Sequence, residues 1–149
     1  MKPDIHPQAA IAPGYLANHA ARVFNRVVDA RLREHGLTLA LIGPLLLLSW
    51  KGPMLQRDMV RASAVKQPAM VALLDKLEAM DLVEREALAA DKRAATVRLT
   101  AAGADAAAIG GSILTEVNQL GVASFSEDEA ALFIGFLGRL IANLEPAEK

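Results

Sequence analysis

Apolar residues recur at spacings of three and four along most of the chain, and such spacing is typical of α-helices with one buried side. The segment 67–80 shows it well and has Pro68 in its first turn, where the missing amide hydrogen is tolerated. After Leu82 the pattern changes to alternation, which returns at 96–99 and predicts two short paired strands. The stretch 86–93 has no period and is expected to form the tip of a hairpin. The apolar stripe of the helix consists of Met70, Leu73, Leu74, Leu77 and Met80.

Earlier segments predict two more helices. Residues 14–35 carry an apolar stripe that ends at Gly36, which suits the left-handed backbone at a helix C-terminus. Thr38 can cap the next helix, but Pro44 would either bend that helix or lie in its first turn. We expect the helix to start near Gly43, after a short turn.

The remaining helices follow from local signals. A short helix is predicted at 55–61, and a tight turn leads from it into the helix 67–80. A further helix is expected at 101–120, with a bend at the double glycine Gly110-Gly111. Ser126-Glu-Asp-Glu129 matches a capping box that opens a last helix, to about residue 144.

Two short helices joined by a tight turn and followed by a hairpin form a winged helix-turn-helix. The expected fold is mostly α with a small two-stranded β wing. Hydrophobic residues make up 53% of the chain but aromatic residues only 4%, so the core is built from Ala, Leu and Val. Helices that are apolar on more than one side indicate surface buried between subunits, and an alanine-rich monomer is the alternative.

Several classes of protein are excluded by what the sequence lacks. There is no cysteine, and therefore no disulfide framework and no thiolate metal site. The longest apolar run, 39–48, is interrupted by Gly43 and Pro44 and is too short for a membrane span of ~20 residues. The N-terminus does not have the pattern of a secretory signal, so a cytoplasmic location is expected. No nucleophile motif, phosphate loop or metal-ligand spacing is present, so we expect neither an enzyme nor a cofactor.

The segment KQPAMVALLDKLEAMDLVER from Lys66, followed by Asp91-Lys92-Arg93-Ala94 and by VRLTAAG at 97–103, resembles the MarR family of bacterial transcription regulators. The resemblance covers about residues 36–103. It implies a homodimer in which 36–100 form the winged DNA-binding head and the flanking helices join the subunits. The whole chain, 1–149, is then a single domain with an N-terminal arm at 1–12 and dimerisation helices at 13–35 and 101–145.

Charge is unevenly distributed although the net charge is only −1. Residues 51–98 hold more Lys and Arg than Asp and Glu, whereas 99–149 are acidic. This polarity is expected if only the middle of the chain meets phosphate, but solvated helix faces also segregate charge by chance. A pseudo-palindromic double-stranded operator is the expected partner.

The helix 67–80 is the expected reader of base edges. Gln67 can pair with adenine, and the neighbouring lysines can touch a base or a phosphate. Alanines replace the hydroxyl residues that are usual in the family. Recognition of the DNA sequence would then depend more on groove shape and on methyl contacts. The resemblance implies that Asp91 orients Arg93 toward the minor groove, with Lys92 assisting; a surface ion pair is the alternative. Arg85 can serve a phosphate or an acid such as Glu84. The predicted DNA-binding residues are Lys66, Gln67, Ala69, Met70, Lys76, Arg85, Asp91, Lys92 and Arg93.

The resemblance also implies a small-molecule pocket beside the first helix. Tyr15, His19, Arg22 and Arg26 follow one side of that helix and could meet Trp50, a setting that suits an anionic or aromatic effector. The alternative is that the two arginines pair with acids such as Asp29 and that His19 lies in a dimer interface.

Two functions follow. The first is a ligand-responsive MarR-like repressor, with a mechanism in which an effector changes the separation of the two reading helices. The second is a winged-helix dimer that binds proteins or sequesters a ligand without reading DNA, because the reading helix is poor in polar groups.

Overall fold

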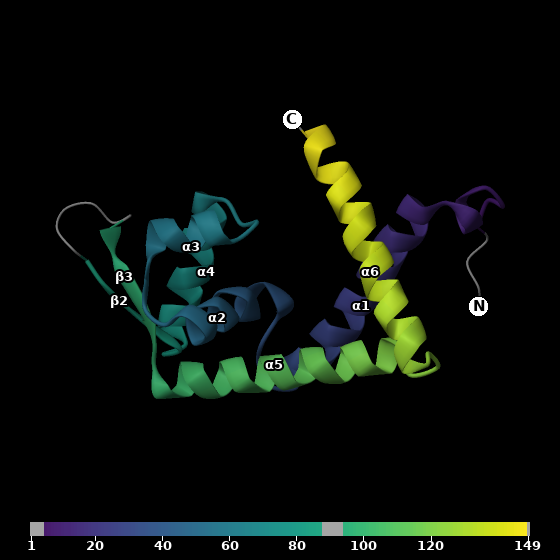
Figure 1. Cartoon of the computed structure of the whole chain (residues 1–149). Helices are drawn as coiled ribbons and strands as arrows, with labels where there is room; N and C mark the ends of the chain where they lie inside the picture. Colours follow the sequence, from purple (N-terminus) through teal and green to yellow (C-terminus); the bar gives the residue numbers. More distant parts are fainter. Residues whose placement is uncertain (1–4, 88–93, 149) are drawn as a thin grey trace. The chain divides into compact units, whose positions relative to one another are not determined.

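The structure is a computed structural model that describes residues 5–87 and 94–148 (Figure 1). It forms two compact units, residues 1–115 and 116–149. The fold is mostly helical with a small antiparallel sheet, as predicted. The elements are η1 (Ala9–Ile11), α1 (Pro13–Arg33), α2 (Leu39–Lys51), β1 (Met54–Leu55), α3 (Gln56–Ala62), α4 (Gln67–Ala79), β2 (Val83–Glu86), β3 (Thr96–Leu99), α5 (Ala101–Gly121), α6 (Glu127–Leu144) and η3 (Glu145–Glu148).

The sheet has three strands in the order β1-β3-β2 rather than the two that were predicted. β2 and β3 form the expected hairpin, with Val83 opposite Leu99 and Arg85 opposite Val97. Val83 and Val97 are buried and Arg98 is exposed, so the alternation predicted for these strands is present. The missed strand β1 has only two residues, too few to show any alternation in the sequence.

The prediction that α2 begins near Gly43 is wrong, because the helix begins at Leu39 with Thr38 as its cap. The Thr38 hydroxyl accepts a bond from the Leu41 amide at 3.3 Å, and Asp29 on α1 accepts from the Leu39 amide at 2.7 Å. Pro44 therefore lies inside the helix. An interior proline costs about 3 kcal/mol, and burying each large aliphatic side chain contributes about 1.5–3 kcal/mol, so several of them offset it. The buried side chains of α2 are Leu41, Ile42, Pro44, Leu45 and Leu48.

The end of α1 confirms the role predicted for Gly36. This glycine has φ +72°, and its amide bonds to the Arg33 carbonyl at 3.0 Å while the Leu37 amide bonds to the Leu32 carbonyl at 3.1 Å. This pair of bonds is a Schellman motif, and both of its leucines are buried. The motif turns the chain from α1 toward the Thr38 cap.

The core of the first unit lies around α4. Met70, Leu74 and Leu77 are fully buried, at the spacing of four and three that the sequence showed. Leu73 is only half-buried and Met80 is exposed, so the buried stripe is narrower than predicted. α4 therefore has one side in the core and leaves its other side exposed.

The junction between the sheet and α5 explains the Leu-Thr-x-x-Gly pattern. The Thr100 hydroxyl accepts a hydrogen bond from the Gly103 amide at 3.0 Å and donates one to the Asp81 carbonyl at 2.6 Å. Asp81 itself has a left-handed backbone, with φ +60°. A Cβ on Gly103 would lie 1.9 Å from the Leu82 carbonyl oxygen. Only glycine fits here, so the start of α5 is fastened to the turn that follows α4.

α5 runs without interruption through Gly110-Gly111, from Ala101 to Gly121, and its ribbon shows no kink, so the bend predicted there is absent (Figure 1). A Cβ on Gly110 would lie 3.1 Å from the Ile42 side chain, and one on Gly111 would lie 3.7 Å from Leu46. These glycines therefore serve close packing of α5 on α2 rather than bending.

The second unit consists of the end of α5, a short turn and α6 with η3. The predicted capping box is confirmed: the Ser126 hydroxyl accepts from the Glu129 amide at 3.1 Å, and the Glu129 carboxylate accepts from the Ser126 amide at 2.9 Å. Phe125 and Phe133 contact edge to face with ring centroids 5.6 Å apart. No residue of α6 is buried.

Candidate nucleic-acid interface

The outward side of α4 is the candidate reading surface. Ala69, Ala72 and Lys76 are exposed and lie three and four residues apart, so they share the side opposite the core. Lys66 and Gln67 are also exposed at the N-terminal end of the helix, where free amides favour a negative ligand such as phosphate. The surface is thus small and largely apolar, with cations at both ends.

Met70 does not belong to this surface, and its prediction as a DNA contact is wrong. Its side chain is fully buried. The same spacing that made Met70 part of the apolar stripe with Leu74 and Leu77 fixes it on the core side, and one residue cannot serve both sides of a helix.

Arg85 joins the reading helix to the wing strand. Its guanidinium donates to Asp75 at 2.6 Å and to Glu78 at 3.0 Å, both on α4, and its side chain is only 20% exposed. The acid partner suggested by the sequence was Glu84, but that residue lies within β2, opposite Arg98 on β3. Arg85 therefore holds β2 against α4 and neutralises two carboxylates beside the reading surface.

The electrostatics agree with this geometry. The side-chain hydrogen bond from Arg85 lowers the pKa of Glu78, and the same bond raises the pKa of Arg85 further above neutral pH. Glu78 is therefore ionised and Arg85 is charged at neutral pH. Because Asp75 also accepts from this guanidinium, neither carboxylate meets an approaching phosphate as an unpaired anion.

The wing residues Asp91, Lys92 and Arg93 lie outside the described residues, so their predicted roles stay predictions. The strands that lead to them carry Glu86 and Arg98, which form an ion pair at 3.1 Å.

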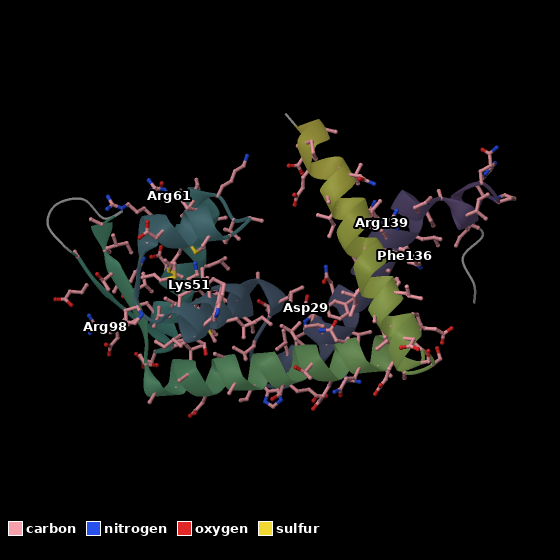
Figure 2. The ribbon with its side chains drawn as sticks, viewed as in Figure 1. Asp29, Lys51, Arg61, Arg98, Phe136 and Arg139 are labelled. Atoms are coloured by element: carbon pink, nitrogen blue, oxygen red, sulfur yellow. The ribbon has the colours of Figure 1, made fainter. Side chains whose placement is uncertain are left out.

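Exposed cations on the head were missed by the sequence reasoning. Arg57 and Arg61 are exposed on α3 at a spacing of four, with Arg61 3.7 Å from Asp58, and Arg98 is exposed on β3. Figure 2 shows Arg61 on α3 and Arg98 beside the sheet, at separate places on the head. The spacing of Arg57 and Arg61 was visible in the sequence, but without the fold it did not show which side of α3 faces outward.

The candidate effector residues are only partly brought together. His19, Arg22, Asn25 and Arg26 line an open hollow on α1, and Tyr15 stacks on His19 with centroids 6.2 Å apart. In the described part of the chain neither arginine has an ion pair, because Asp29 caps α2 instead of pairing with them. The two arginines therefore make the hollow cationic, and the Tyr15–His19 stack adds aromatic rings at one of its ends.

Trp50 is not among the residues that line this hollow. It is 79% exposed at the end of α2, and the Lys51 ammonium lies 5.1 Å from its ring centroid. Its prediction as part of the pocket on α1 is therefore not supported by the fold.

The C-terminal helix is apolar enough to be compared with a membrane span, which was not predicted from the sequence. Residues 127–148 have the length and a mean hydropathy of 1.3 that would allow a helix to cross a membrane, and none of this stretch is buried. The acids at its start and Arg139 interrupt this stretch, so it does not form an unbroken apolar run in the sequence. Length and composition alone do not distinguish a membrane from a protein surface as the cover for such a helix.

These features define the class of protein: a winged helix-turn-helix whose reading helix has a free outer side. Comparison with known proteins agrees. Residues 35–94 match the model of the MarR family. The transcriptional regulator PA3341 has 33% sequence identity and a TM-score of 0.73, over 89% of this chain and 98% of that one.

Two further solved structures are similar. The MarR-family protein Rv2887 of Mycobacterium tuberculosis has 28% identity and a TM-score of 0.70, over 87% of this chain and 94% of that one. MarR from E. coli, solved with operator DNA, has 22% identity and a TM-score of 0.78, over 92% of this chain and 99% of that one. The chain belongs to the MarR family, whose members are transcription regulators and not enzymes.

Proposed function

We propose that this protein is a homodimeric transcription regulator that binds a pseudo-palindromic operator, with one α4 helix in each of two successive major grooves. The observation that carries the proposal is the two-sided α4, which buries Met70, Leu74 and Leu77 and leaves Ala69, Ala72 and Lys76 exposed. The MarR structure with operator DNA shares this fold. Two such helices about 34–36 Å apart fit half-sites one helical turn apart.

The residues divide by the contacts that their chemistry allows. Gln67 can read a base through its amide, and the alanine methyl groups can contact thymine methyls. Lys66, Lys76 and the wing residues Lys92 and Arg93 supply phosphate or minor-groove contacts, with Asp91 orienting Arg93. Arg85 acts through α4 rather than on the DNA, because its guanidinium is occupied by two carboxylates.

The test is a fluorescence-anisotropy titration of the full chain against DNA from upstream of its own coding region and a scrambled duplex, at two salt concentrations. Tight binding to the upstream DNA alone, with log affinity falling steeply with log salt, supports the proposal. Arg93→Ala is expected to lower the affinity and to reduce the salt slope by about 1, and the exposed Arg33 on α1 provides the matched control Arg33→Ala.

A second function is favoured by one observation. The exposed side of α4 has alanine at positions 69 and 72, a surface that would also suit a protein partner or leave the dimer to sequester a ligand. Equal, weak binding to both duplexes, unchanged by Arg93→Ala, would support this second function and overturn the first.

We further infer that the regulator is a repressor that responds to a small anionic or aromatic effector, and that it works in the cytoplasm away from membranes. The hollow on α1 supports the effector, because Arg22 and Arg26 have no acidic partner among the described residues and the Tyr15–His19 stack adds an aromatic surface. Calorimetric titration with benzoate and with phenol is the test. Benzoate binding that Arg22→Ala abolishes, together with weaker operator binding by the benzoate complex, is the expected result; operator affinity unchanged by either compound would overturn it.

A further inference from the structure

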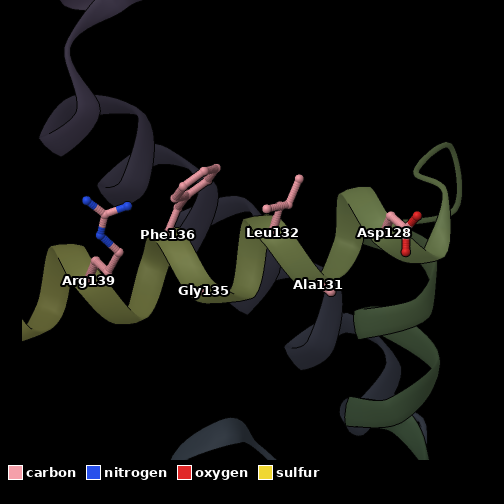
Figure 3. Close-up of a pocket in the computed structure, with 6 residues that line it drawn as sticks. All are labelled: Asp128, Ala131, Leu132, Gly135, Phe136 and Arg139. Carbon is pink, nitrogen blue, oxygen red and sulfur yellow. The ribbon is translucent and has the colours of Figure 1, made fainter.

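One face of α6 carries a pattern that is complementary to itself. An open hollow along the helix is lined by residues of α6 alone. Figure 3 shows Leu132 and Phe136 extending from the same side of the helix, with Asp128 toward one end and Arg139 toward the other. The spacings 128, 132, 135 and 139 are four, three and four, so these positions share one face. The lining residues are Asp128, Ala131, Leu132, Gly135, Phe136 and Arg139.

This face is apolar in the middle and exposed. Leu132 is 58% exposed and Phe136 is 56% exposed. Removing such side chains from water is favourable by roughly 25 cal/mol per Å² of apolar surface. The face therefore needs a cover.

The charges at its ends are opposite and unpaired. In the described part of the chain neither Asp128 nor Arg139 has an ion pair, and the Arg139 guanidinium lies 5.8 Å from the Phe136 ring centroid. The two residues are three helical turns apart, roughly 16 Å along the axis. A cover that matches this face must carry the opposite charges at the same separation.

We propose that the cover is α6 of a second copy, paired antiparallel so that Asp128 of each subunit faces the partner's Arg139. A two-fold axis then passes between Phe133 and Ile134. In this register Leu132 faces the partner's Gly135, and Ala131 faces the partner's Phe136. Each large side chain thus meets a small one, and the absence of a Cβ on Gly135 lets the two helices approach closely. The inference rests on the homodimer of the proposed function and adds its register.

The charges select the antiparallel direction. A parallel pair would place Asp128 beside the partner's Asp128 and Arg139 beside the partner's Arg139, and like charges repel at both ends. A bilayer is a poorer cover than a second copy. Arg139 would lie near the middle of the membrane-length stretch 127–148, where a charged residue costs about 2.5–3.5 kcal/mol.

A charge-reversal cycle tests the register on the full chain by sedimentation equilibrium. Asp128→Arg or Arg139→Asp alone sets like charges together at two symmetric contacts and is expected to raise the dimer Kd by roughly tenfold. The double variant restores opposite charges and should return to within about threefold of wild type. Glu127→Arg is the matched control, because it removes an acid from the same first turn without lying on this face.

The chain contains no cysteine, so introduced thiols give an unambiguous second test. Asp128→Cys carrying a mass tag is mixed with untagged Arg139→Cys and oxidised. Tagged-to-untagged disulfides support the register, whereas disulfides within one variant would need thiols about 16 Å apart to meet and would overturn it.

The outcomes separate this inference from the function on which it rests. A wild-type dimer that binds operator but shows neither rescue by the double variant nor mixed disulfides overturns the register and leaves the function standing. A wild-type monomer that partitions into anionic phosphatidylglycerol vesicles overturns both the register and the homodimer.

Discussion

The two units of this protein contrast in where their apolar side chains lie. In the first unit, α2 and α4 bury Leu41, Ile42, Leu45, Leu48, Met70, Leu74 and Leu77 against the small sheet. In the second unit α6 is as apolar as a membrane span and buries nothing. The head therefore contains its own core, whereas α6 has none and, as proposed above, is covered by a second copy of the chain.

Folding stability and subunit assembly therefore depend on different parts of the chain. The head supports a reading surface on α4, and it must keep that surface in place whether or not a partner is bound. The helix α6 supplies surface to an interface, so its contribution appears only when the partner is present. Substitutions of the same type in the two units should therefore behave differently, which two comparisons test, and two further measurements test how the head holds its reading helix.

The largest effect is expected from adding one methyl group at Gly103. A Cβ there would meet the Leu82 carbonyl oxygen at 1.9 Å, and this backbone group cannot move without disturbing the turn after α4. Gly103→Ala is expected to lower the free energy of unfolding by about 3 kcal/mol or more, measured by urea denaturation. Gly138→Ala on α6, where nothing lies within 4 Å, is the control and should not destabilise the isolated chain. Equal effects at the two positions would contradict the contrast.

The next comparison uses large-to-small substitutions and protein concentration. Leu74 is fully buried, so Leu74→Ala should cost about 2–5 kcal/mol at every protein concentration. Leu132 lies on the proposed dimer face of α6 and is 58% exposed, so Leu132→Ala should matter only where the protein is dimeric. Thermal unfolding at concentrations above and below the dimer Kd measures this. A concentration-independent loss for Leu132→Ala would show that α6 is covered within its own chain.

Much of this contrast was readable from the sequence. The spacing of Met70, Leu74 and Leu77 predicts the buried side of α4, and the capping box at Ser126 predicts the start of α6. These signals are local, since they depend on residues within one or two turns.

Tertiary packing decided the features that sequence reasoning missed. Pro44 lies inside α2 because burial of its neighbours outweighs the lost hydrogen bond, and Gly110 does not bend α5 because it packs against Ile42. Likewise, the carboxylates that pair with Arg85 are Asp75 and Glu78 on α4, ten and seven residues earlier in the chain. The sequence around Arg85 does not show that they, rather than the adjacent Glu84, are its partners.

The third prediction concerns Arg85, which links the sheet to the reading helix. We expect Arg85→Ala to weaken operator binding by roughly tenfold, because it loosens β2 from α4 and leaves Asp75 and Glu78 unpaired beside the DNA. The slope of log affinity against log salt should stay unchanged, since Arg85 does not touch phosphate. Adding Asp75→Asn and Glu78→Gln should recover part of the affinity. A slope reduced by about 1 would instead identify Arg85 as a direct phosphate contact.

The smallest effect should appear in the pH dependence of the head. Because Arg85 lowers the pKa of Glu78, the unfolded chain binds a proton more readily than the folded chain as the pH falls. The stabilisation by this pair is therefore complete above the ordinary glutamate pKa of about 4.3 and is lost at lower pH. It should amount to less than about 1 kcal/mol, since the Glu78 side chain is 44% exposed. Urea denaturation between pH 3 and pH 6 measures it, with Glu78→Gln as the variant that removes this part of the pH dependence. A variant whose pH profile parallels that of the wild type would show that the link between wing and reading helix rests on Asp75 alone.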